Sequence, residues 1–434
     1  MADRYWIETL GCPKNQVDSD KLVGTLVAGG LEAAGSAGDA DVVVVNTCAF
    51  VEAARQESVD TVLALSEVRR PGARLVVTGC LAERYGADLA DALPEVDQVA
   101  GFGVPIVLGA RPGDGGASTA TEAAATDLAR LDLLNLPRPR PSAPWAYVKV
   151  AEGCDRKCGF CAIPSFRGTQ RSRPAEAVLA EVEGLGVTEV VLVAQDLASY
   201  GRDIGRPGAI LDLVRQVSAL VPRVRLLYLY PSELNDGLID TICATGVAYF
   251  DLSLQHVSRP LLRRMRRWGD GERFGERIGT IRRRQPDAAF RSSFIVGYPG
   301  ETEDDHDKLL SFLAEAQLDW AGFFPFSREE GTYAAGLDGA VDPDLVGERL
   351  RELGELQDAI TVSRRAALVG QSIEVLVDEE GVGRSHREAP EIDGIVVLPP
   401  SVPVGSLATV TVTGAAGPDL EAYPELPPSD AEGR

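Results

Sequence analysis

The stretch CDRKCGFC, residues 154–161, places three cysteines within eight residues, directly after a short apolar run. Soft thiolates at this close spacing suit an iron-sulfur cluster, because iron in such clusters prefers sulfur ligands. A cubane cluster has four irons, so three protein ligands leave one iron free to bind a further molecule. A zinc knuckle needs a fourth Cys or His nearby, and none lies between Cys80 and Cys243 outside this stretch. The motif therefore indicates an iron-sulfur centre with an open coordination position.

Six apolar runs of strand character occur in this part of the chain, one before the motif and five after it. Amphipathic stretches such as 175–185, 210–220 and 304–316 separate them. Strands that alternate with helices are typical of parallel α/β folds, and six such units predict a partial α/β barrel. The active site of such a barrel lies at the carboxyl ends of its strands. The six runs are 147–150, 189–193, 224–229, 249–254, 290–296 and 320–326, and a polar helix is expected over 344–368.

Three further cysteines follow apolar runs near the N-terminus. The runs 5–10, 42–45 and 75–77 end just before Cys12, Cys48 and Cys80 respectively. The spacing between these cysteines is close to that of one strand-helix-strand unit. If the strands are parallel, the three thiols emerge at the same edge of one sheet, where open α/β folds bind their ligands.

The composition predicts a three-domain organisation of overall α/β class. We expect an N-terminal parallel α/β domain over 4–108, a Gly-, Pro- and Thr-rich linker over 109–143, and the barrel domain over 144–368. Residues 369–434 contain short strand-like runs between Gly and Pro turns, which predict a small antiparallel β-barrel.

The chain of 434 residues has a formal net charge of −22, and its last part is the most acidic. Residues 366–434 contain three basic and twelve acidic residues and no lysine. Such a surface repels a phosphate backbone, so direct RNA binding is disfavoured and a basic partner is favoured. No apolar run is long enough to span a membrane, and the seven cysteines fit a reducing compartment, so we expect a cytoplasmic protein.

The motif at 154–161, on the first strand of a partial barrel, resembles the radical SAM superfamily. The resemblance implies that Cys154, Cys158 and Cys161 hold a [4Fe-4S] cluster that binds S-adenosyl-L-methionine (SAM) and cleaves it reductively to a radical. It also implies an external electron donor. The stretch IVGYPGE, residues 295–301, is similar to the glycine-containing segment that lines the SAM pocket. The residues expected to contact the cofactor are Phe160, Gln195, Gly297 and Glu301, with Asp196 as an alternative to Gln195.

The N-terminal cysteines narrow the resemblance to the methylthiotransferases, whose three-part architecture covers essentially the whole chain. It implies a second [4Fe-4S] cluster on Cys12, Cys48 and Cys80, and a terminal OB-like barrel known as the TRAM domain. Four stretches are similar to the RimO type: LGCPKNQVDS (10–19), EGCDRKCGFCAIPSFRG (152–168), AQD (194–196) and LQH (254–256).

The RimO type implies a transferase that adds a methylthio group to the β-carbon of an aspartate in the basic small-subunit ribosomal protein S-twelve, free or on the ribosome. Removing hydrogen from an unactivated methylene requires a carbon radical, because that group has no proton acidic enough for general-base chemistry. Two alternatives remain open at this point. One is a MiaB-type methylthiotransferase acting on a tRNA adenosine, and the other is a non-enzymatic iron-sulfur electron-transfer module.

Overall fold

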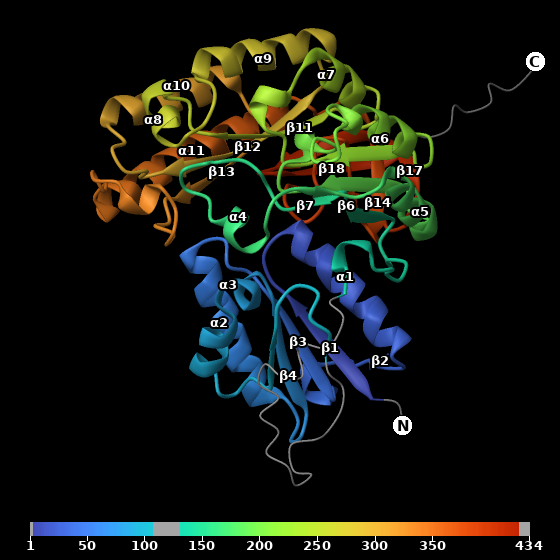
Figure 1. The fold of residues 1–434 in the computed structure, drawn as a ribbon. Coiled ribbons are helices and arrows are strands. Elements are labelled where there is room, and N and C mark those ends of the chain that lie inside the picture. Colours follow the sequence, from blue (N-terminus) through green and yellow to red (C-terminus); the bar gives the residue numbers. More distant parts are fainter. Residues whose placement is uncertain (1–2, 107–130, 425–434) are drawn as a thin grey trace, which may run out of the picture.

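The computed structural model describes residues 3–106 and 131–424, and it divides into three domains (Figure 1). The N-terminal domain has a parallel sheet with the strand order β2-β1-β3-β4-β5. Val42 to Val45 are fully buried on β3 because helices cover both faces of the sheet. The strands are β1 (Arg4–Thr9), β2 (Glu32–Ala33), β3 (Val42–Thr47), β4 (Arg74–Gly79) and β5 (Gln98–Ala100), and the helices are α1 (Pro13–Ala28), α2 (Glu52–Val68) and α3 (Cys80–Ala92).

The central domain is the expected partial barrel. Its strands pair in parallel as β6-β9-β10 and β11-β12-β13, and a bridge between Leu229 and Leu252 connects the two groups. The strands are β6 (Trp145–Lys149), β9 (Glu189–Val193), β10 (Arg223–Leu226), β11 (Tyr249–Gln255), β12 (Ala289–Val296) and β13 (Trp320–Pro325). The helices are α5 (Ala175–Leu185), α6 (Ala209–Ser218), α7 (Asp236–Cys243), α8 (Arg259–Arg264), α9 (Gly271–Arg284), α10 (Glu303–Ala316) and α11 (Pro343–Ala366).

A two-stranded ribbon holds the cysteine stretch at the barrel. β7 (Ala151–Glu152) pairs antiparallel with β8 (Arg171–Ser172), and the connection between them carries all three cysteines and α4 (Ile163–Phe166). Gly153 has a φ of +78°, and a Cβ there would lie 2.1 Å from the carbonyl oxygen of Thr169. Only glycine fits this turn into the connection.

The C-terminal domain is a closed five-stranded barrel in the order β14-β15-β16-β18-β17. Its pairs are antiparallel except β16 with β18, a parallel pair that the sequence pattern did not predict. The strands are β14 (Ser372–Glu379), β15 (Val382–Arg384), β16 (Val396–Val397), β17 (Leu407–Ala416) and β18 (Asp419–Pro424).

The connection between β15 and β16 closes the central barrel at the amino ends of its strands. Ala389 and Ile392 pack against side chains of the barrel interior. Tyr147 Oη donates to the carbonyl of Pro390 at 2.9 Å, and Trp320 Nε1 donates to that of Arg387 at 2.6 Å. This part of the C-terminal domain therefore has a structural role, at the end of the barrel opposite the cysteines.

The predicted linker lies partly outside the described residues, which exclude 107–130. Its second part packs against α1, since Leu134 is buried and Lys21 Nζ donates to the carbonyls of Leu134 and Leu136 at 2.8 and 3.0 Å. Residues 131–143 thus belong to the domain interface. Among the described helices, none combines the length and apolarity that a membrane span requires.

Glu189 joins the central and C-terminal domains as a fully buried carboxylate. It contacts Arg223 at 3.1 Å and Arg225 at 2.9 Å on the neighbouring strand, and Arg384 of β15 at 3.2 Å. Burial alone would raise the pKa of Glu189, but Arg225, Arg384 and Arg223 together lower it well below its usual value. The carboxylate is therefore charged at neutral pH.

Glu189→Gln should destabilise the protein by about 3–5 kcal/mol, because it leaves buried arginines without their counter-charge. Chemical denaturation followed by circular dichroism measures this change. Glu374→Gln, at an exposed position on β14, is the matched control and should stay within about 0.5 kcal/mol of wild type. Equal stability of the two variants would contradict this assignment.

Candidate functional site

The structure brings Cys12, Cys48 and Cys80 together at the carboxyl ends of three adjacent strands, β1, β3 and β4. Cys12 caps the N-terminus of α1, and Cys80 is the first residue of α3. Gly11 has a φ of +94° and lies so close to Cys48 that a Cβ there would be 3.0 Å from its sulfur. The expected parallel arrangement of these cysteines is therefore present.

The surroundings of this trio distinguish the three thiols. Burial raises the pKa of Cys12, but the charges of Lys14 and Arg167 and the amides of Asn15 and Lys14 lower it overall. Burial raises the pKa of Cys48 to about 12 and also raises that of Cys80, despite the opposing charge of Arg167. Cys12 is thus the thiol most easily converted to a thiolate.

Cys154, Cys158 and Cys161 form a second trio in the connection between β7 and β8. The amide of Arg156 donates to Cys154 Sγ at 3.4 Å, and Arg267 Nη1 donates to Cys158 Sγ at 3.3 Å. Burial raises the pKa of Cys154 to about 11 and that of Cys161 to about 12. Hydrogen bonds and positive charge close to the sulfurs favour thiolates bound to a metal.

Each trio offers three sulfur donors, the ligands that hold iron-sulfur clusters in proteins. Across residues 3–106 and 131–424, no three Cys, His, Asp or Glu side chains surround one metal-ion position. In a [4Fe-4S] cluster each thiolate binds a different iron, so its ligands stand further apart than those of a single ion. Three sulfur donors with adjacent cationic groups fit such a cluster at both trios.

A buried ionic network joins the two trios across the domain interface. Arg167 donates to Cys80 Sγ at 3.0 and 3.3 Å and to Asn15 Oδ1 at 2.6 Å, both in the N-terminal domain. It also contacts Glu152 of the barrel at 2.9 Å and Asp18 of α1 at 3.2 Å. Glu152 lies two residues before Cys154 in the sequence. The network therefore contacts Cys80 of the first trio and the residue that lies just before the second trio.

Lys149 completes this network from the first barrel strand. It is fully buried and pairs with both Asp18 and Glu152. The short helix α4 adds apolar contacts, because Ile163 and Phe166 pack with the core of the N-terminal domain. Figure 1 shows α4 between the N-terminal sheet and the barrel, and α1 running from the barrel along the side of that sheet. The carboxyl ends of both parallel sheets therefore face one another.

Gln195 lies at the carboxyl end of β9, next to the network. Its Nε2 donates to Glu152 Oε1 at 2.5 Å, while its buried Oε1 has no partner. Asp196 instead pairs with Arg156 at 2.6 Å and accepts from Ser199. Asp196 Oδ1 is also buried without a partner, so both residues offer a free acceptor at this edge of the barrel.

The other expected cofactor residues have internal partners. Glu301 accepts from the amides of Gly297 and Tyr298 at 2.6 and 3.2 Å, and its other oxygen pairs with Arg349 at 3.0 Å. Gly297 has a φ of +80°, and a Cβ there would lie 2.5 Å from Val346 on α11. The local fold alone accounts for a glycine at 297 and a glutamate at 301. Contact of these two residues with a cofactor therefore stays a prediction. Phe160 packs at the margin of the barrel core, and its predicted role is likewise untested.

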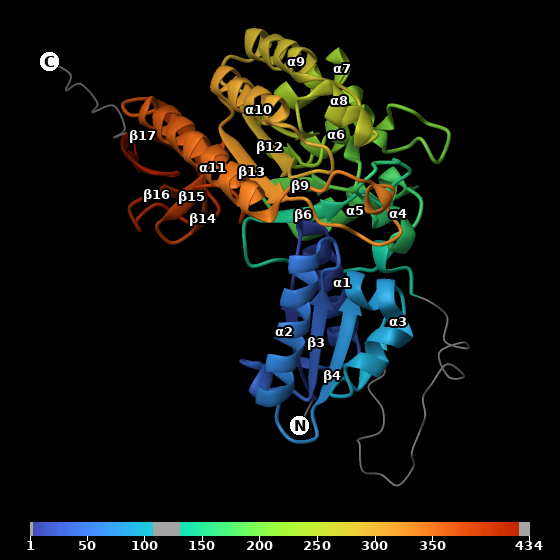
Figure 2. The same ribbon diagram turned by 90° about the vertical axis from the view of Figure 1, so that its left-hand side faces the viewer.

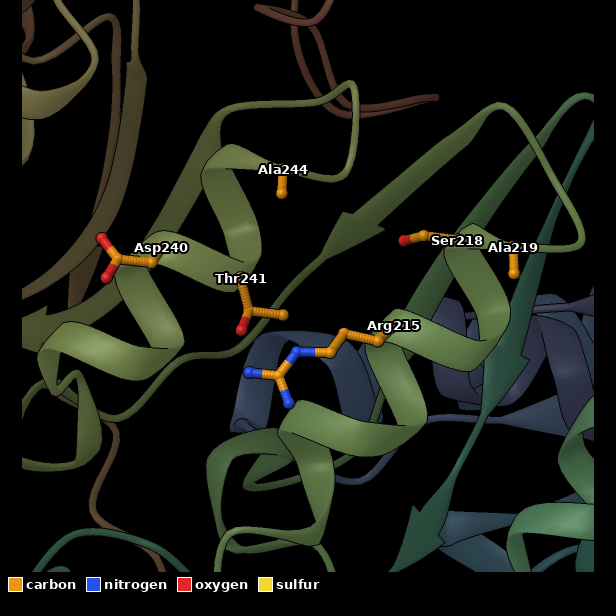
Figure 3. A pocket seen from close by; sticks show the side chains of 6 residues that line it. All are labelled: Arg215, Ser218, Ala219, Asp240, Thr241 and Ala244. Carbon is orange, nitrogen blue, oxygen red and sulfur yellow. The ribbon is translucent and has the colours of Figure 1, made fainter.

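A surface groove of about 500 Å³ lies between α6 and α7, away from both trios (Figure 3). Arg215, Ser218, Asp240 and Thr241 are among its lining residues. None of the candidate site residues takes part, and α6 and α7 lie on the outside of the barrel (Figure 1). The groove therefore contributes nothing to the candidate site.

Sequence reasoning assigned no role to Arg167, Asp18, Glu152 or Lys149. The sequence gives little indication of their role. Lys149 and Glu152 are isolated charges next to an apolar run, and Asp18 is one of several polar residues on α1. Their pairing becomes evident only when the two domains are placed together.

Family models match the three domains. They are the Uncharacterized protein family UPF0004 over residues 4–101, the Radical SAM superfamily over 148–313, and the TRAM domain over 369–424. The chain is 43% identical to the ribosomal protein uS12 methylthiotransferase RimO of Kineococcus radiotolerans, over 96% of each protein. The chain belongs to the RimO methylthiotransferase family.

Other members of the RimO family show the same near full-length similarity. The Salinispora arenicola protein is 42% identical over 97% of this chain and 95% of its own length, and the Cutibacterium acnes protein is 41% identical over 96% and 97%.

The fold also resembles that of TsrM, a radical SAM methyltransferase from Kitasatospora setae solved with cobalamin and a [4Fe-4S] cluster. The TM-score is 0.53 at 14% identity, over 92% of this chain and 83% of that one. At this level of identity the likeness concerns the fold alone.

In the reduced, metal-free protein, Cys12 should be alkylated by iodoacetamide before Cys48 and Cys80 at about pH 8, because only its pKa is lowered within this trio. Peptide mapping by mass spectrometry measures the three rates. Faster labelling of Cys48 than of Cys12 would contradict the electrostatic account of this site.

Proposed function

We propose that this protein is a radical SAM methylthiotransferase that modifies an aspartate of ribosomal protein uS12 and uses two [4Fe-4S] clusters. The names of its RimO relatives support the reaction and the substrate. The observation that supports the two-cluster proposal is that Arg167 contacts both Cys80 of the first trio and Glu152, which lies two residues before Cys154 of the second. Sulfur must reach the carbon from which hydrogen is removed, so the two sites have to share a chamber.

When bound, the cluster at Cys154, Cys158 and Cys161 would supply reductive cleavage of SAM for hydrogen abstraction, and the one at Cys12, Cys48 and Cys80 would supply the position for sulfur. Arg267 and the Arg156 amide hold the first set of sulfurs in place, and Arg167 holds Cys80. The free Oε1 of Gln195 is an acceptor suited to the amino group of SAM. Phe166 of α4 and the side chain of Arg167 are buried at the interface between the two sites.

The C-terminal barrel supports a basic partner, although part of its acidity is used internally. Asp378 pairs with Arg384 inside the C-terminal barrel, and Glu388 pairs with Arg365 of α11 across the domain interface. Exposed acidic residues remain at Glu374, Glu379, Glu380, Glu391 and Glu421. They would attract a basic ribosomal protein and repel RNA, and this attraction would weaken with salt.

The direct test is anaerobic loading of the protein with iron and sulfide, followed by reductant, SAM and uS12. Mass spectrometry should show a uS12 peptide that has gained one methylthio group in place of one hydrogen on an aspartate. A parallel incubation with tRNA tests the alternative substrate. Methylthiolation of a tRNA nucleoside and no change in uS12 would overturn the proposal.

Cys154→Ala and Cys48→Ala should separate the two sites. Fully loaded wild type should contain about eight irons per chain, and each variant fewer, because it lacks one cluster ligand. Cys154→Ala should produce no 5′-deoxyadenosine, whereas Cys48→Ala should still cleave SAM but leave uS12 unthiolated.

Chromatography of 5′-deoxyadenosine measures SAM cleavage, and mass spectrometry of uS12 measures its methylthiolation. Equal loss of SAM cleavage in the two variants, with the iron at the first site intact, would contradict this division of roles.

A further inference from the structure

Lys14 is a buried lysine beside the N-terminal cysteine trio. It lies in the first turn of α1, two residues after Cys12, and its side chain is 8% exposed. Its ammonium nitrogen sits 3.2 Å from the centroid of the Tyr228 ring, which belongs to the barrel domain. Lys14 and Tyr228 therefore meet across the domain interface, at the edge where both sheets end.

Lys14 differs from the other buried cations in lacking an oxygen acceptor. Within residues 3–106 and 131–424, every other buried lysine or arginine has a carboxylate or carbonyl partner. Those residues are Lys21, Lys149, Arg167, Arg173, Arg223, Arg225, Arg349, Arg365, Arg384 and Arg387. The described contact of the Lys14 ammonium is the face of one aromatic ring. Lys14 is largely buried as a residue, and an ammonium with only this partner lacks the oxygen acceptors that such groups normally have.

The acidic groups around Tyr228 are already paired. Asp251 accepts from the Tyr228 amide at 2.9 Å and pairs with Arg291 at 3.4 Å. Arg291 also pairs with Asp393 of the C-terminal domain at 3.3 Å. Tyr228 itself is a non-glycine residue with a φ of +65°, a strained conformation that is often found at functional sites. The carboxylates near this ring are thus engaged elsewhere. The anionic group that the protein itself offers near Lys14 is the Cys12 thiolate, since the charge of Lys14 lowers the pKa of that thiol.

We infer that Lys14 binds the side-chain carboxylate of the substrate aspartate, with the Tyr228 ring as the platform beneath the ion pair. This inference rests on the proposed function and assigns the residue that recognises its substrate. The reacting β-carbon is one bond from that carboxylate, so a carboxylate held at Lys14 brings the β-carbon to the Cys12 side of the chamber. An asparagine in the same position cannot form the ion pair, and a nucleobase carries no carboxylate.

The test compares binding of uS12 with that of its Asp→Asn form, changed at the aspartate that mass spectrometry identifies as modified. Full-length protein loaded with iron and sulfide is titrated anaerobically by calorimetry. Wild type should bind the aspartate form about tenfold or more tightly, because a desolvated charge pair contributes at least this much. Lys14→Met keeps the aliphatic stem on Tyr228 and should lose this preference, whereas Lys14→Arg should retain much of it.

Lys308→Met is the charge-matched control, since Lys308 is exposed on α10, and it should behave as wild type. Iron content and the EPR spectra of both clusters should be the same in all variants. Three results would overturn the inference: a preference for aspartate that persists in Lys14→Met, equal binding of both substrates by a wild type that does modify uS12, or loss of iron from the Cys12 site in Lys14→Met. A wild type that neither binds nor modifies uS12 would overturn the proposed function together with it.

Discussion

The guanidinium of Arg167 is buried between two domains, and the architecture depends on satisfying its charge there. Asp18 and Asn15 of α1, Glu152 of the barrel, and the sulfur of Cys80 all accept from it. A buried cation without such partners costs several kcal/mol, so the two domains are stable only in the relative position that brings these acceptors together. This position also sets the two cysteine trios opposite each other.

The directions of the two parallel sheets explain why these partners meet. In both sheets the connections that carry the cysteines leave the carboxyl ends of the strands. The opposite end of the barrel is closed by the β15-β16 connection, whose Ala389 fills the interior between the first residues of several strands. The C-terminal domain thus covers this end of the barrel, and Figure 2 shows the C-terminal barrel beside α11 and away from the N-terminal sheet.

Much of this arrangement could be predicted from the sequence, because it follows from spacing and periodicity. The strand at Glu189–Val193 and the helix at Ala175–Leu185 have the predicted bounds, and each N-terminal cysteine follows its predicted strand. The strands β2, β5, β7, β8 and β15 were not predicted, because two or three residues carry little periodic signal. The longer strand β18 was not predicted either. The fully buried Arg223 and Arg225 on β10 could not be identified either, since their partner Glu189 belongs to another strand.

The central claim is that the two trios hold two clusters in one chamber, and pulsed EPR on the loaded, reduced protein tests it most directly. The account predicts a resolved dipolar interaction between two reduced [4Fe-4S] clusters in wild type, which disappears when either Cys154 or Cys48 is replaced by alanine. Two clusters with no measurable magnetic interaction, or a wild-type spectrum of a single cluster at full iron loading, would contradict it.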